Sequence, residues 1–199
     1  MRNGIRALII KMECAELIRE EEKDKYQYIY TLLFEKAITT TILFFLAILF
    51  HNMIETLVFS ICFIELRKRT GGFHCKSFIG CLVFTVCIYF LILVLGRMVN
   101  VSAYPTMHLA SCVSAGWIYL IGAVNVPKMH YTKEEYQYQK KTARIIVTIE
   151  WIAVIAMILV KIDENIVFFA EFGMVMASIS TFGEWYKIHA RSSSDANNA

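Results

Sequence analysis

The sequence contains little charge, proline or glycine, and each shortage excludes a class of protein. Only 19% of its 199 residues are charged, whereas 57% are hydrophobic and the mean hydropathy is +0.53. Soluble domains have about 25% charged residues, so this composition is typical of a membrane protein. Two prolines and nine glycines leave little room for a fibrous or loop-rich chain. Length and repeated apolar runs predict one all-α bundle embedded in a membrane.

The sequence also lacks the charge excess of nucleic-acid-binding proteins and the cysteine spacing of zinc-binding or disulfide-rich proteins. Its formal net charge of +3 is too small to predict a nucleic-acid partner. The cysteines show no paired C-x-x-C spacing, so neither a zinc site nor a disulfide framework is predicted, and we expect no cofactor. Those inside the apolar runs are expected to pack as small hydrophobic side chains. The six cysteines are Cys14, Cys62, Cys75, Cys81, Cys87 and Cys112.

Long apolar runs predict the membrane helices. Residues 37–66 are almost continuously apolar, which is too long for one upright span of about 20 residues. We predict a tight hairpin that turns at His51 and Asn52, and one long, tilted helix is the alternative. Thr132 and Glu135 form a capping-box pattern, which predicts that a short cytosolic helix starts there. The predicted spans are residues 32–50, 53–66, 78–99, 104–125, 143–160 and 166–183.

The two ends of the chain are expected to differ from this membrane-embedded domain at residues 26–185. In residues 1–25, Ile5, Leu8, Ile9 and Met12 recur at helical spacing among basic residues. This pattern predicts an amphipathic helix that lies on the membrane surface. Residues 186–199 are polar and predict a disordered tail.

Basic residues collect in two of the predicted loops and in the tail. Residues 67–76 hold four and residues 128–144 hold five, whereas the opposite loops carry only Arg97 and Lys161. Positive charge favours the cytoplasmic side of a membrane. We therefore expect six spans with both termini inside. The loop at 67–77 would then lie in the cytosol, where thiols stay reduced.

This basic loop brings a histidine and a cysteine close together in sequence. His74 and Cys81 are seven residues apart, so in one continuous helix they would lie about 10 Å apart along its axis. Proton transfer needs about 3 Å, so the backbone must leave helical geometry if the two act together. Gly71 and Gly72 give that freedom. We expect Cys81 near the start of the third span, where the helix dipole favours a thiolate.

Spacing alone leaves other interpretations open. Basic loops beside a membrane often contain histidines with no catalytic role. Cys75 is a second thiol, but the residue next to His74 usually projects elsewhere. A metal site formed by His74, Cys75 and Cys81 would lack a fourth ligand.

The residues of this loop resemble the signature of the accessory gene regulator B family. That signature combines an arginine, a glycine-glycine-aromatic-histidine run and a cysteine seven residues after the histidine. The likeness covers about residues 35–185, by motif and by the order of the spans. The matching residues are Arg67, Gly71, Gly72, Phe73, His74, Lys76, Ser77 and Cys81.

The resemblance implies a peptidase of the bacterial cell membrane that matures the precursor of a quorum-sensing peptide. Cys81 would be the nucleophile and His74 its general base. Cleavage near the C-terminus of the precursor would leave an acyl-enzyme thioester, and a cysteine of the precursor would then displace Cys81 and close a thiolactone ring. The expected partners are this AgrD-like precursor, the lipid bilayer and a second copy of the chain in a homodimer.

The resemblance gives the neighbouring residues supporting roles. Arg67 would either orient a carboxylate of the substrate or anchor the loop at the membrane interface. Gly71, Gly72 and Lys76 would position the loop or the substrate. Ser77 or a backbone carbonyl would orient His74.

Ionisable residues inside the predicted spans offer a different function. Glu150 is expected to form a salt bridge with Lys141 or Arg144. Glu171 lies deeper, and a structural pairing with another helix is favoured over the lining of a polar cavity. A small peptide transporter that uses Glu150, Glu171 and His108 is the alternative to the peptidase, and a scaffold without chemistry is a third.

Overall fold

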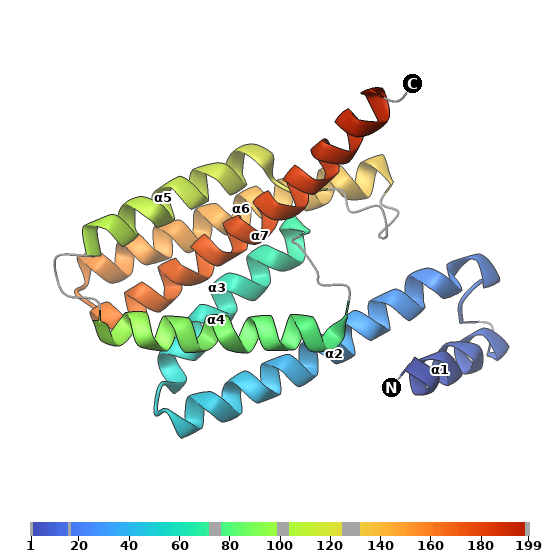
Figure 1. Cartoon of the computed structure of the whole chain (residues 1–199), viewed down its shortest axis with the longest axis horizontal. Coiled ribbons are helices and arrows are strands. Elements are labelled where there is room, and N and C mark those ends of the chain that lie inside the picture. The colour runs from blue at the N-terminus through green and yellow to red at the C-terminus, as the bar shows by residue number, and fades with distance from the viewer. Residues whose placement is uncertain (1, 16, 72–76, 99–103, 125–131, 198–199) are drawn as a thin grey trace. The chain divides into compact units, whose positions relative to one another are not determined.

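The computed structural model of the chain describes residues 2–15, 17–71, 77–98, 104–124 and 132–197, and it describes side chains up to residue 190. These residues contain helices and no strand, which confirms the all-α prediction (Figure 1). The helices are α1 (Arg2–Cys14), the 3-10 turn η1 (Glu20–Glu22), α2 (Lys23–Leu49), α3 (Met53–Thr70), α4 (Phe78–Met98), α5 (Tyr104–Ile121), α6 (Lys133–Leu159) and α7 (Glu164–Asn197).

The chain divides into two compact units, residues 1–49 and 50–199. In the first unit, α1 packs against the beginning of α2. Ile5 and Ile9 of α1 are buried with Ile18, and Tyr26 and Tyr30 cover them. The predicted amphipathic helix is therefore present. Part of its apolar face contacts α2, and its location on a membrane surface stays a prediction. The expected boundary at residue 25 falls inside this unit.

The apolar stretch at residues 37–66 is broken in its middle, as predicted. Helix α2 ends at Leu49 and α3 begins at Met53. His51 between them has a φ of 57°, a left-handed conformation that no continuous helix contains. The carbonyl of Asn52 then accepts the first hydrogen bond of α3, from the amide of Thr56 at 3.0 Å. The alternative of one long helix is wrong.

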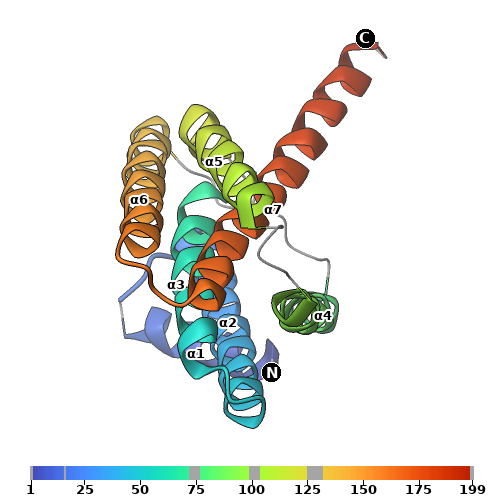
Figure 2. The ribbon, with the colours of Figure 1, turned by 90° about the vertical axis from the view of Figure 1, so that its left-hand side faces the viewer.

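In the second unit, α7 is the helix around which α3, α5 and α6 (Lys133–Leu159) pack (Figures 1 and 2). Their shared core consists of small and branched side chains, so the helices approach closely. Helix α4 joins them through a buried hydrogen bond of 2.9 Å between the hydroxyls of Thr56 and Tyr89. The buried core residues are Cys62, Leu66, Ile118, Val147, Val154, Val167, Ala170, Met174 and Ala177.

Length and composition separate these helices into two kinds. Four stretches of the described residues are long and apolar enough to cross a membrane, namely residues 20–49, 78–98, 133–159 and 164–190. The other two predicted spans, α3 and α5, have 18 residues each and are not among these stretches. Both pack along α7. The six predicted spans are therefore four helices of spanning type and two shorter helices packed against one of them.

The two basic segments of the sequence begin at the same end of this bundle. The amide of Val124, after α5, donates to the carbonyl of Thr70 at the end of α3, at 2.9 Å. Arg69 reaches the first turns of α6 and donates to Gln139 at 3.3 Å. The ends of α3 and α5 and the start of α6 thus form one basic end of the bundle. This arrangement is what the charge pattern requires, while the cytosolic location of this end stays a prediction.

Helix α6 begins where the sequence predicts a cap. The hydroxyl of Thr132 accepts from the amide of Glu135 at 3.2 Å, and the Glu135 carboxylate accepts from the amide of Thr132 at 2.9 Å. This is the reciprocal capping box. The helix continues without a break into the apolar run, so it is longer than the short cytosolic helix that was expected.

The end of the chain differs from the prediction of a disordered tail after residue 185. Helix α7 continues to Asn197. One turn after Trp185, the His189 ring packs on the Trp185 ring at 4.2 Å, and its Nδ1 lies 2.9 Å from the Trp185 carbonyl oxygen. These i,i+4 contacts extend the helix beyond the apolar stretch, and polar composition alone does not reveal them.

Gly122 provides a test of the basic end. Its φ is +74°, and an added Cβ would lie 2.4 Å from Cγ of Lys140. We expect Gly122→Ala to lower the free energy of unfolding by at least about 1–2 kcal/mol, the cost of a left-handed alanine. Denaturant titration in detergent micelles measures this change.

Gly116→Ala, inside α5, is the matched control for Gly122, which directly follows this helix. An added Cβ there meets nothing within 4 Å, so alanine should stabilise the helix by about 0.5–1 kcal/mol. Equal stability of the two variants would contradict the packing of α5 against α6 at Gly122.

Candidate functional site

Cys81 lies in the first turn of α4, as predicted. Its amide donates to the carbonyl of Ser77 at 3.1 Å, which is the first hydrogen bond of the helix. Its own carbonyl accepts from the hydroxyl of Thr85 at 2.9 Å. The Cys81 residue is half-buried. A cysteine in this position lies at the positive end of the helix dipole.

Ser77 caps this helix. Its Oγ accepts from the amide of Gly80 at 3.2 Å, which satisfies one of the free N–H groups of the first turn. A serine directly before an apolar helix is a known cap signal. Ser77 was predicted only as a residue that orients His74, so this capping role was missed.

The other half of the motif lies at the end of α3. Gly71 has φ 70° and ψ 51°, and its amide donates to the carbonyl of Arg67 at 3.3 Å. This left-handed cap needs glycine and ends the helix. The guanidinium of Arg67 lies 5.3 Å from the centre of the Phe63 ring, a cation–π contact that holds it beside its own helix.

Chain length limits the distance between these two helix ends. The connection from Gly71 to Ser77 has six peptide steps, which span at most about 20 Å. Ser77, at the start of α4, therefore lies no more than about 20 Å from the end of α3 at the basic end of the bundle. Gly72, His74 and Lys76, together with the rival thiol Cys75, lie outside the described residues, so the meeting of His74 with Cys81 stays a prediction.

Glu171 pairs with another helix, which is the role favoured for it. Its Oε1 lies 2.8 Å from Nδ1 of His108 and accepts from the hydroxyl of Ser111 at 2.9 Å. Glu171 is 1% exposed, whereas His108 lines a cavity of about 590 Å³ at the end of the bundle opposite the basic end. The cluster fastens α5 to α7.

The prediction that Glu150 forms a salt bridge with Lys141 or Arg144 is wrong. Arg144 instead donates to the backbone carbonyls of Tyr119 and Leu120, at 2.9 and 3.3 Å, and Lys141 forms no ion pair with a described residue. Glu150 is buried, because it faces into the bundle from α6 and not toward the basic end. Its electrostatic neighbours are Glu65 and Cys62 of α3.

The candidate site is not a metal centre within the described residues. No group of three or more His, Cys, Asp or Glu side chains there could hold a metal ion. The described part of the motif offers a half-buried thiol in the first turn of α4 and three basic side chains in the last turn of α3. That arrangement suits nucleophilic attack by sulfur on a polar substrate at the membrane surface.

The cap at Ser77 gives a testable prediction about the first turn of α4, which contains Cys81. We expect Ser77→Ala to loosen the first turn of α4 by about 1 kcal/mol, which accelerates amide exchange there about fivefold. Hydrogen exchange followed by mass spectrometry of a peptide spanning residues 77–85 measures this. Ser77→Asp keeps an acceptor at the same place and should exchange like the original protein. Equal rates in all three proteins would contradict the cap.

Comparison with known proteins agrees with the resemblance of the motif. The family model described as "Accessory gene regulator B" matches residues 5–181, which is most of the chain. No curated protein and no solved structure matches the chain. The match includes the end of α3 and the start of α4, which carry the motif. It extends from α1 into the middle of α7. The chain therefore belongs to the accessory gene regulator B family.

Proposed function

We propose that this protein is a membrane cysteine endopeptidase that cleaves a small quorum-sensing precursor and promotes its cyclisation. Family membership links the chain to the accessory gene regulator system and to its AgrD precursor peptide. The observation that carries the proposal is Cys81, a half-buried thiol in the capped first turn of α4, seven residues after His74.

The proposed reaction begins with the transfer of the Cys81 proton to His74. The thiolate attacks the carbonyl carbon of a peptide bond near the C-terminus of the precursor. His74 returns the proton to the leaving amine, which departs with the C-terminal fragment. The N-terminal fragment stays on Cys81 as a thioester.

Ring closure needs no further source of energy. A cysteine thiol of the precursor attacks the same carbonyl carbon, a thiolactone forms and Cys81 leaves as a thiolate that regains a proton. One thioester is exchanged for another, so the step is nearly neutral in free energy.

The neighbouring residues position these groups. The cation–π contact with Phe63 supports an anchoring role for Arg67 at the end of α3. Gly71 supports a reversal of the chain after this helix, and Gly72 and Lys76 would complete the loop. The basic end would face the cytosol, and the precursor would lie in the membrane interface beside it. A homodimer remains part of this proposal.

A peptide exporter without covalent chemistry is the second candidate. The contact between buried Glu171 and half-buried His108 favours it, because His108 also lines the cavity of about 590 Å³. Ionisable groups inside a membrane often mark a transport path. In the exporter, Glu171 would be essential and the Cys81 thiol would not.

Cleavage of an AgrD-type precursor in reconstituted vesicles separates the two candidates. We expect Cys81→Ser and His74→Gln to lower the cleavage rate at least about 100-fold, because each removes one partner of the proton transfer. The precursor should still co-purify with both variants. Gel analysis of the released C-terminal fragment measures the rate.

Two further variants serve as controls. Cys87→Ser removes an exposed thiol from the same helix and should cleave normally. Glu171→Gln should keep cleavage when the protein remains folded. Normal cleavage by Cys81→Ser would refute the proposed nucleophile, and export lost only in Glu171→Gln would favour the transporter.

A further inference from the structure

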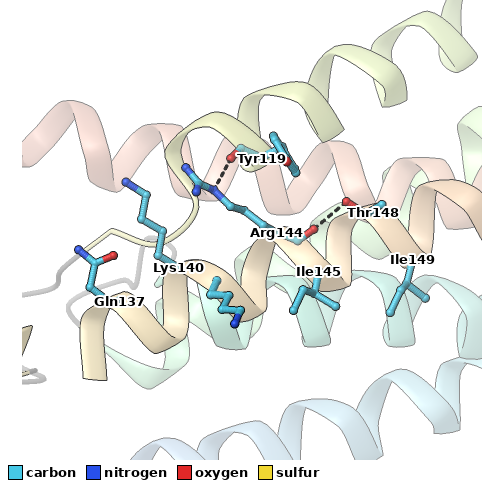
Figure 3. Close-up of a pocket in the computed structure, with 8 residues that line it drawn as sticks. Tyr119, Gln137, Lys140, Arg144, Ile145, Thr148 and Ile149 are labelled. Atoms are coloured by element: carbon cyan, nitrogen blue, oxygen red, sulfur yellow. Dashed lines mark hydrogen bonds between the residues drawn. The ribbon is translucent and has the colours of Figure 1, made fainter. Parts of the chain in front are cut away.

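An open groove lies at the basic end of the bundle, between the end of α5 and the first half of α6. Its volume is about 440 Å³. Figure 3 shows Arg144 reaching from α6 toward Tyr119 of α5, while Ile145 and Ile149 project from α6. The lining residues are Tyr119, Gln137, Lys140, Lys141, Arg144, Ile145, Thr148 and Ile149.

The cations of this groove are held in place by α5. Arg144 donates to the carbonyls of Tyr119 and Leu120, and its guanidinium lies 5.6 Å from the centre of the Tyr119 ring. The stem of Lys140 packs against Gly122, where any side chain would collide with it. The guanidinium of Arg144 and the stem of Lys140 are therefore positioned before any ligand binds, which lowers the entropic cost of binding.

No carboxylate of the described residues neutralises this charge. Lys140, Lys141 and Arg144 form no ion pair there. All three side chains line the groove, so their positive charges act on the same ligand. The groove is therefore complementary to an anion.

The lower wall of the groove is apolar and exposed. Ile145 is 50% exposed and Ile149 is 59% exposed. Both belong to the apolar part of α6, one of the helices that could cross a membrane. The change from cations to exposed isoleucines occurs at Ile145, directly after Arg144. A ligand that fills this groove must have an anionic end and an apolar end.

We propose that the groove binds one anionic phospholipid. The phosphate headgroup contacts Lys140, Lys141 and Arg144, and an acyl chain lies along Ile145 and Ile149. Arginine and lysine just outside an apolar helix segment are the usual partners of acidic headgroups. A lipid matches both parts of the lining, whereas an acidic peptide matches the cations alone. This inference does not rest on the proposed peptidase function.

Native mass spectrometry of the full chain in detergent tests this proposal. The probes are phosphatidylglycerol and phosphatidylcholine with the same acyl chains. We expect the first phosphatidylglycerol to bind more tightly than the first phosphatidylcholine. The double variant Lys140→Gln/Lys141→Gln should bind phosphatidylglycerol up to roughly 30-fold more weakly, since each basic residue near a lipid surface contributes about a factor of five to the affinity.

The variants are chosen to preserve the fold. Glutamine retains the Cβ and Cγ atoms of Lys140 that pack on Gly122. Lys133→Gln/Lys161→Gln removes the same charge at positions outside the groove and should change the affinity less than twofold. Equal thermal midpoints for the two double variants confirm that neither has unfolded.

The remaining outcomes overturn the proposal. Equal losses in the two double variants would mean that net charge and not this groove attracts the lipid. Equal affinity for the two lipids would mean that the groove does not recognise an anionic headgroup. Displacement of phosphatidylglycerol by a soluble glutamate-rich peptide, with the same loss in Lys140→Gln/Lys141→Gln, would assign the groove to a peptide.

Discussion

The hydrogen bond from the amide of Val124 to the carbonyl of Thr70 is the contact on which the arrangement of the basic end depends. It joins residues 54 positions apart in sequence, and Thr70, whose carbonyl accepts it, is fully buried. Because it fixes the end of α3 to the end of α5, it brings the starts of both basic segments to one end of the bundle. A membrane protein can then keep its positive charge on one side.

This constraint links the two sites of the molecule. The short connection from Gly71 to Ser77 keeps Ser77, at the start of α4, within about 20 Å of the end of α3. The groove beside Lys140 and Arg144 lies at the same end, next to the end of α5. In the proposed function, a precursor in the membrane interface would meet the start of α4 and this groove at the same end of the bundle.

The sequence predicted the helices and their caps well because these depend on local pattern. The break at His51, the capping box at Thr132 and the position of Cys81 all follow from residues close together in the chain. Two local features were missed, the cap at Ser77 and the continuation of α7 beyond Trp185. The other errors concern contacts between distant residues. The burial of Ile5 and Ile9 against α2 and the partners of Glu150 depend on which helices pack together, and a single sequence does not reveal that.

The central claim is that Cys81 forms a covalent bond to the precursor, and intact-mass spectrometry tests it most directly. The purified protein is incubated with its precursor in nanodiscs and weighed. The account predicts a mass increase equal to the N-terminal fragment, which hydroxylamine removes and which Cys81→Ala lacks. Cleavage without any adduct, or an adduct that persists in Cys81→Ala, would contradict it.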